Sequence, residues 1–148
     1  VPSMLQGMLG KYPDNMLAAK FNVPYAVAVA VVFGKTDITV FRPQVIADET
    51  VRNMANRVTV NVDPTLVDSR NLPKTIASIH LTNGQVLTGE NRLVRGDYAN
   101  PIGRDELVGK FDFLTEQFLG RDRCEKFKSM MLNLEDIEDI RSLTNILG

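Results

Sequence analysis

The feature that most constrains the fold is an apolar run in the first quarter of the chain. From Val23 to Phe33 every residue except Pro24 is apolar, and Gly34 follows directly. The run is too short to cross a bilayer, which takes ~20 residues. Its alternating alanines and valines would suit a strand, but a proline near the start and a glycine after the end are typical of a helix. We predict a buried helix that starts near Pro24 and ends by Gly34.

Composition limits the class of protein. The chain has 148 residues, of which 44% are hydrophobic and 24% charged, as expected for one globular domain over 1–148. A net charge of −1 gives no electrostatic attraction to nucleic acid or to an anionic membrane. One cysteine excludes an internal disulfide and fits a reducing compartment, and the N-terminus lacks the pattern of a signal peptide. We therefore expect a soluble, cytoplasmic protein with no nucleic-acid or membrane partner.

The rest of the chain combines strand and helix patterns. Asp48–Arg57 predicts a short helix capped by its aspartate, and Val58–Val62 alternates like a half-buried strand. Two more strands are predicted around Asn83–Gly84, a strong hairpin signal, and from Asp105 onward the hydrophobic period becomes helical. The prediction is an α+β fold: a small antiparallel sheet with the buried apolar helix and the C-terminal helices packed against it.

The residue types that bind metals are too few to form a site. His80 is the only histidine and Cys124 the only cysteine, so a zinc site would lack most of its ligands. Cys124 also lies within a helical apolar stripe, which indicates a core position. The acidic stretch Leu134–Arg141 lacks the glycine and ligand spacing of a calcium loop. We expect no metal site.

The start of the apolar helix is the candidate binding site. Lys20 and Tyr25 flank it, with Asn22 between them. The free N–H groups of a helix start favour anions, and an ammonium and a phenol hydroxyl beside them could bind a carboxylate. The structural alternative is that Lys20 extends its apolar stem over the surface while Tyr25 caps a core. On the residues alone the structural alternative is favoured.

The order of several segments resembles a known family. These segments are NMLAAKFNVPYAVAVAVVFG, FRPQVIADETVRNMANRVTVNVDP, ASIHLTNGQVLTGE, RGDYANPIGRDELVGKFDFL and LNLEDIEDIRSLTNIL. Together they resemble the C-terminal part of the MmgE/PrpD family, which holds 2-methylcitrate dehydratase, cis-aconitate decarboxylase and iminodisuccinate epimerase. The resemblance covers essentially the whole chain, and it is specific as a succession of segments rather than in any one of them.

The resemblance implies a two-domain enzyme of which this chain is the smaller domain. In such an enzyme a large helical domain carries most catalytic residues, and the α+β domain closes over the site. The chain also starts without methionine, which suggests a piece of a longer protein. The implied function is one wall of a small-polycarboxylate site in a lyase of the 2-methylcitrate dehydratase type. The implied partners are the helical domain and a second copy of the protein. The resemblance implies no cofactor, and no catalytic residue is assigned to this chain.

The resemblance also implies which residues face the substrate. Lys20, Asn22 and Tyr25 fall in the segment that resembles the cleft-facing part of the small domain. Asn22 stands where many members have serine, and Pro24 stands where some have glutamine. A second hypothesis, from another class, is a non-catalytic α+β module that binds a partner protein through its apolar helix or its C-terminal helices.

Overall fold

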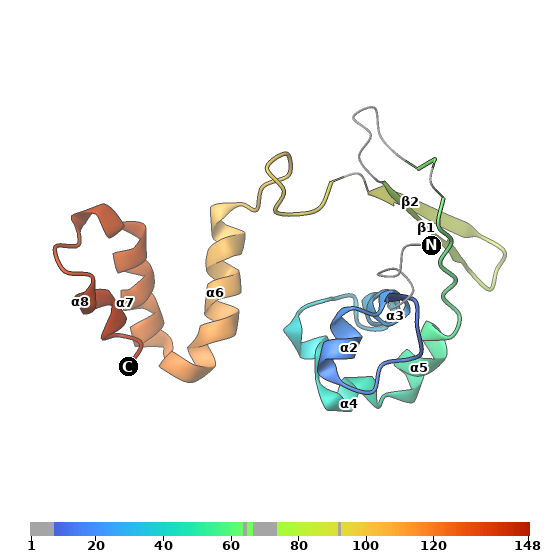
Figure 1. Cartoon of the computed structure of the whole chain (residues 1–148), viewed down its shortest axis with the longest axis horizontal. Helices are drawn as coiled ribbons and strands as arrows, with labels where there is room; N and C mark the ends of the chain where they lie inside the picture. The colour runs from blue at the N-terminus through green and yellow to red at the C-terminus, as the bar shows by residue number, and fades with distance from the viewer. Residues whose placement is uncertain (1–7, 64, 67–73, 92) are drawn as a thin grey trace. The chain divides into compact units, whose positions relative to one another are not determined.

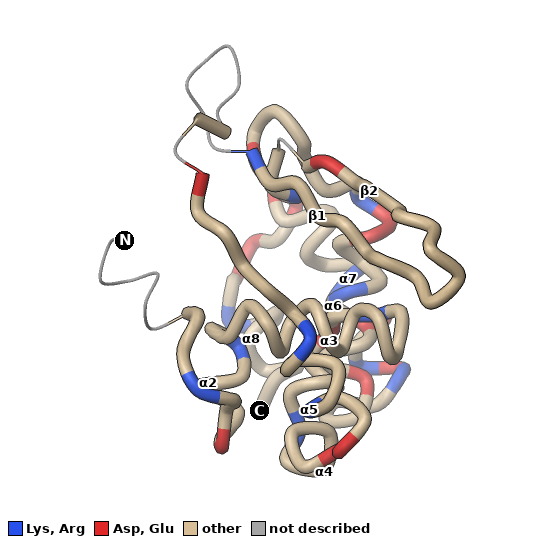
Figure 2. The backbone as a smooth tube through the Cα atoms, turned by 90° about the vertical axis from the view of Figure 1, so that its right-hand side faces the viewer, with Lys and Arg blue, Asp and Glu red and all other residues tan. Residues whose placement is uncertain are grey.

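The structure, a computed structural model, describes residues 8–63, 65–66, 74–91 and 93–148. It divides the chain into two compact units, Val1–Thr65 and Leu66–Gly148, and each is described by itself. Helices and a two-stranded antiparallel sheet are both present, so the predicted α+β class is confirmed. The assignment of 1–148 to a single domain stays a prediction. Basic and acidic residues are interspersed along the backbone (Figure 2), and their numbers, 17 and 18, nearly balance.

Short helices form the first unit. They are α2 (Met16–Lys20), α3 (Val23–Phe33), the 3-10 helix η1 (Ile38–Phe41), α4 (Pro43–Ile46) and α5 (Glu49–Ala55) (Figure 1). Four of them begin at a side chain that accepts a hydrogen bond from a backbone N–H of the first turn: Asn15, Asn22, Asp37 and Asp48. Such caps satisfy N–H groups that have no partner within the helix. The predicted helix after Asp48 is confirmed as α5.

Helix α3 confirms the predicted helix in the apolar run. It starts one residue before Pro24, and it ends at Gly34, whose φ of 67° lies in the left-handed region that glycine adopts most easily. Its burial is one-sided, however. Three of its residues are buried, whereas Val27, Val31 and Phe33 are exposed. Among the described residues no helix is long and apolar enough to cross a membrane.

The buried face of α3 is the centre of the core of the first unit. The core residues come from all five of its helices: Ala19, Tyr25, Ala28, Val29, Val40, Ile46, Val51 and Ala55. Helix α3 packs most extensively against α5. The small side chains of Ala28 and Ala55 suit the close approach of the two helices.

In the second unit a β-hairpin comes first. Strands β1 (Thr75–His80) and β2 (Val86–Asn91) pair antiparallel, with His80 opposite Val86 at the turn end. The predicted turn is confirmed, because Gly84 has a φ of 85° and the Asn83 side chain accepts a hydrogen bond from the Gln85 N–H at 3.0 Å. Every residue of both strands is exposed.

The strand predicted at Val58–Val62 is wrong. The structure assigns no strand to these residues, and no ladder partner for them is present among the residues it describes. Val60 and Val62 are exposed rather than half-buried. Alternating valines fit a pleated surface only where a neighbouring strand supplies the ladder hydrogen bonds, so the pattern alone does not create the strand.

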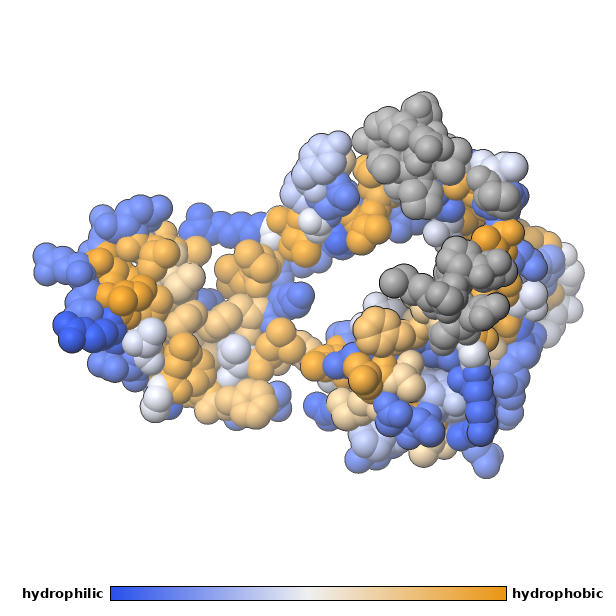
Figure 3. Space-filling view, viewed as in Figure 1, coloured by the Kyte–Doolittle hydropathy of each residue, from blue (hydrophilic) through white to orange (hydrophobic). Residues whose placement is uncertain are grey.

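Three helices and a 3-10 turn complete the second unit. They are α6 (Arg104–Leu119), α7 (Arg121–Leu132), η2 (Leu134–Asp136) and α8 (Arg141–Thr144). Gly120, at a φ of 74°, separates α6 from α7. The two helices meet through stacked rings of Phe111 and Phe127, 5.4 Å apart, and through the ion pair of Lys128 with Asp112 at 2.8 Å. Hydrophobic side chains remain on the visible surface of this helical part (orange at the left of Figure 3).

Candidate functional site

The candidate site lies at the short connection between α2 and α3. Helix α2 ends at Lys20, and Asn22 is already the N-cap of α3. The backbone N–H groups of Phe21 and Asn22 donate to the carbonyls of Ala18 and Ala19, at 3.2 and 3.3 Å. These bonds fix the link, so the three predicted site residues belong to one rigid corner of the first unit.

Lys20 points its charge outward. Its side chain is exposed, and its ammonium has no hydrogen-bond or ion-pair partner in the part of the chain that the structure describes. The neighbouring Phe21 is also 60% exposed. Among the described residues, Lys20 is therefore an exposed cation that could pair with an anion at this corner.

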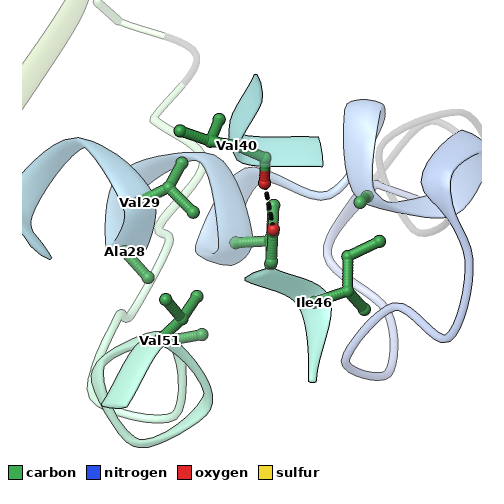
Figure 4. Close-up of a cluster of buried hydrophobic side chains, with 8 residues drawn as sticks. Ala28, Val29, Val40, Ile46 and Val51 are labelled. Atoms are coloured by element: carbon green, nitrogen blue, oxygen red, sulfur yellow. Dashed lines mark hydrogen bonds between the residues drawn. The ribbon is translucent and has the colours of Figure 1, made fainter. Parts of the chain in front are cut away.

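Tyr25 points inward instead. It is fully buried, and its hydroxyl donates to the backbone carbonyl of Val40 at 2.5 Å (dashed line in Figure 4). Its ring meets Tyr12 edge-on at 5.8 Å and Phe41 at 6.1 Å. Burial is the main cause that raises the pKa of Tyr25 to about 12, with smaller effects from Tyr12 and Asp48. The hydroxyl thus stays protonated and engaged within the core.

The Asn22 side chain connects the start of α3 with the segment that precedes α2. It is 5% exposed, and its Oδ1 accepts a hydrogen bond from the Tyr25 N–H at 2.9 Å. Its Nδ2 donates to the backbone carbonyl of Lys11 at 3.2 Å, so it also holds the segment that precedes α2. Both ends of the amide are used inside the protein, as expected for a buried polar side chain.

The structure therefore brings the three residues together but directs them differently. Lys20 presents a charge to solvent, whereas Asn22 and Tyr25 are buried and hold the start of α3. His80 lies on the exposed strand β1 of the second unit. Within the described ranges there is no group of three or more His, Cys, Asp or Glu side chains that could hold a metal ion.

Sequence reasoning missed two residues beside this corner, Tyr12 and Arg52. The Tyr12 ring packs against Tyr25, and its hydroxyl donates to the Ile46 carbonyl at 2.9 Å. The Arg52 guanidinium lies 4.4 Å from the centre of the Tyr12 ring. No local pattern could have found this pair, because the contact joins two segments far apart in the sequence.

Replacing Tyr25 with phenylalanine tests the buried hydroxyl. Loss of its hydrogen bond leaves the Val40 carbonyl without this partner and should lower the free energy of unfolding by about 0.5–1.5 kcal/mol at neutral pH. The folded pKa is raised above the ordinary value of 10.0 to about 12, so the stabilisation is complete below pH 10 and is lost as the pH rises through 12. Urea unfolding should therefore show a weaker alkaline loss of stability in Tyr25→Phe than in the wild type. Equal alkaline losses of stability in the two proteins would contradict the assignment of this effect to Tyr25, because Tyr12 is present in both.

Comparison with known proteins agrees with the segments quoted above. Residues 4–136 match the MmgE/PrpD C-terminal domain. The chain is 25% identical over 136 residues to cis-aconitate decarboxylase of Mus musculus and 24% identical to that of Homo sapiens. In both cases the match covers 92% of this chain and 28% of the relative. The chain thus spans little more than a quarter of the length of these relatives, and it belongs to the MmgE/PrpD C-terminal domain family.

Proposed function

We propose that this chain forms one wall of a small-polycarboxylate site in a lyase of the 2-methylcitrate dehydratase type. The observation that carries the proposal is the family match over residues 4–136. The similarity to two proteins named cis-aconitate decarboxylase supports lyase chemistry on a substrate with several carboxylates. Such a reaction needs cations that hold the carboxylates and acid–base groups that move protons.

In this proposal Lys20 is the residue that touches the substrate. Its exposed ammonium has no partner within the described residues and can pair with a carboxylate as a point charge. Asn22 and Tyr25 are positioning residues of the same site, because their hydrogen bonds to the Tyr25 N–H and the Val40 carbonyl fix the start of α3. They act on the substrate through the backbone that holds Lys20.

The acid–base groups belong to another part of the intact enzyme. Around Lys20 the described residues offer a buried tyrosine whose pKa is raised and no histidine. We propose that a helical domain supplies these groups and that a second copy of the protein completes the assembly. The match covers only 28% of each relative, which supports a catalytic unit larger than this chain. The proposal requires no cofactor.

A second candidate reaction is decarboxylation of cis-aconitate, which the names of the two relatives favour. Dehydration would break one C–H and one C–O bond, form a C=C double bond and release water. Decarboxylation would break a C–C bond, release CO₂ and leave a proton on carbon, in a substrate that already contains a C=C double bond. Both reactions need the same cationic wall and differ in the product that an assay detects.

Assays of the full-length protein that contains this chain test the proposal. We expect formation of an unsaturated acid from 2-methylcitrate, followed by ultraviolet absorbance and mass spectrometry. Release of CO₂ from cis-aconitate without dehydration of 2-methylcitrate would favour the decarboxylase. Absence of both reactions, with stable capture of a partner protein, would favour the non-catalytic interaction module.

A further inference from the structure

A pocket of about 750 Å³ opens on the first unit, and Lys20 does not line it. It is lined by residues 11–15, which precede α2, and by the first residues of α2. The other walls come from α4 with the following Ala47, and from Arg52 of α5. Much of the wall is apolar and includes Tyr12, Pro43, Ile46 and Ala47. This volume lies within the range of ~300–1,000 Å³ typical of small-molecule sites, which are mostly apolar with a few polar groups.

Arg52 supplies a fixed cation at this pocket. Its guanidinium stacks 4.4 Å from the centre of the Tyr12 ring, and the Tyr12 hydroxyl is held by the Ile46 carbonyl at 2.9 Å. A guanidinium stacked on a ring keeps the N–H groups at its edge available for a carboxylate. No hydrogen bond or ion pair engages these N–H groups among the residues with described positions.

Lys11 supplies a second cation to the same pocket. Its backbone carbonyl accepts a hydrogen bond from Asn22 Nδ2 at 3.2 Å, which holds this position beside Tyr12. The Lys11 ammonium forms no ion pair with any residue that the structure describes. Asp14 also lines the pocket and accepts from Asn15 Nδ2 at 2.7 Å. With Lys11 and Arg52 against Asp14, the charged lining sums to +1.

Asp48, which precedes Arg52 by one helical turn, forms no ion pair with it within the described residues. The Oδ1 atom of Asp48 accepts hydrogen bonds from the N–H groups of Thr50 and Val51, at 2.7 and 3.2 Å. These bonds hold the carboxylate at the start of α5 as its N-cap. Arg52 therefore keeps its capacity to bind an external carboxylate.

We propose that this pocket binds an organic anion that has one carboxylate and an apolar body, of the arylalkanoate or medium-chain alkanoate class. The carboxylate would lie between Arg52 and Lys11, and the hydrocarbon would lie against Ile46, Ala47 and Pro43. A polycarboxylate fits less well, since its further charges would meet the apolar wall and Asp14. This site is separate from the one at Lys20, and the proposal does not depend on the proposed lyase function.

Titration of the full 148-residue chain with 4-phenylbutyrate, followed by two-dimensional ¹H–¹⁵N NMR, tests the site. We expect saturable shifts at Tyr12, Ile46 and Ala47, and binding of the neutral analogue 4-phenyl-1-butanol at least ten-fold weaker. Equal affinity for acid and alcohol, or saturable shifts only at other residues, would overturn the proposal. Absence of saturable binding at millimolar acid would overturn it as well.

Variants distinguish a specific site from general charge attraction. Arg52→Ala and Lys11→Ala should each weaken binding of the acid by about ten-fold, the effect expected for a lost charge-assisted hydrogen bond. Arg57→Ala is the matched control, because Arg57 is exposed on the same unit and does not line the pocket. Equal losses in Arg57→Ala and Lys11→Ala would overturn the proposal. Lys11→Ala removes an exposed side chain, so this comparison stands even if Arg52→Ala destabilises the packing on Tyr12.

Discussion

Replacing Lys20 with alanine in the full-length protein is expected to lower kcat/KM for the proposed polycarboxylate substrate by about ten- to a hundred-fold. The ammonium of Lys20 is exposed and has no partner in the described structure, so its proposed role is to pair with a substrate carboxylate. Loss of a hydrogen bond to a charged group costs about 1.5–3 kcal/mol, and ~1.4 kcal/mol corresponds to a factor of ten in rate. Steady-state kinetics of purified wild type and variant provide the measurement.

Two comparisons separate this role from a structural one. The Lys20 side chain is exposed, so Lys20→Ala should unfold at the same temperature as the wild type. Lys20→Arg keeps the charge and should recover part of the lost kcat/KM. Wild-type kinetics in Lys20→Ala would remove Lys20 from the site, and a lowered unfolding temperature would assign it a structural role.

The elements that the sequence predicted correctly are set by local chemistry. Asn22 caps α3, Pro24 fits its first turn, and Gly34 ends it in a conformation that costs glycine little. The turn at Asn83–Gly84 is likewise determined by two adjacent residues. In these cases the residues that specify the structure are neighbours in the chain, so the pattern could be read without knowledge of the fold.

The elements that were missed depend on distant contacts. Val58–Val62 has the alternation of a strand but no ladder partner among the described residues. Helix α3 is apolar on all sides, a pattern typical of full burial, yet Val27 and Val31 are exposed. Which side of such a helix packs depends on its neighbours, here mainly α5.

The candidate site shows the same division. Its location at the α2–α3 corner followed from a lysine, an asparagine and a tyrosine that lie close together in the sequence. The directions of their side chains did not, because the Val40 carbonyl holds Tyr25 and the Lys11 carbonyl holds Asn22. The sequence thus placed the three residues near one another, and only the structure separated the exposed cation of Lys20 from the two buried side chains beside it.

The 148-residue chain alone is expected to show no turnover of 2-methylcitrate, citrate or cis-aconitate above a buffer control. A lyase of this kind needs groups that accept and donate protons, and each typically contributes ~10²–10⁴-fold to the rate. At the Lys20 corner the buried Tyr25 hydroxyl, whose pKa is about 12, is a poor proton acceptor near neutral pH. Without one group that accepts a proton and one that donates a proton, the rate should fall by about 10⁴-fold or more relative to the full-length protein.

The experiment compares the purified chain with the full-length protein under identical conditions, and far-ultraviolet circular dichroism verifies that the chain is folded. Turnover by the chain that disappears in Lys20→Ala would place the chemistry within these residues and contradict the proposed division between two domains. Turnover that persists in that variant would point to a contaminating enzyme. The third possible result is a folded chain without activity beside an active full-length protein. It would support the division, in which this chain supplies the carboxylate-binding wall and the rest of the protein supplies proton transfer.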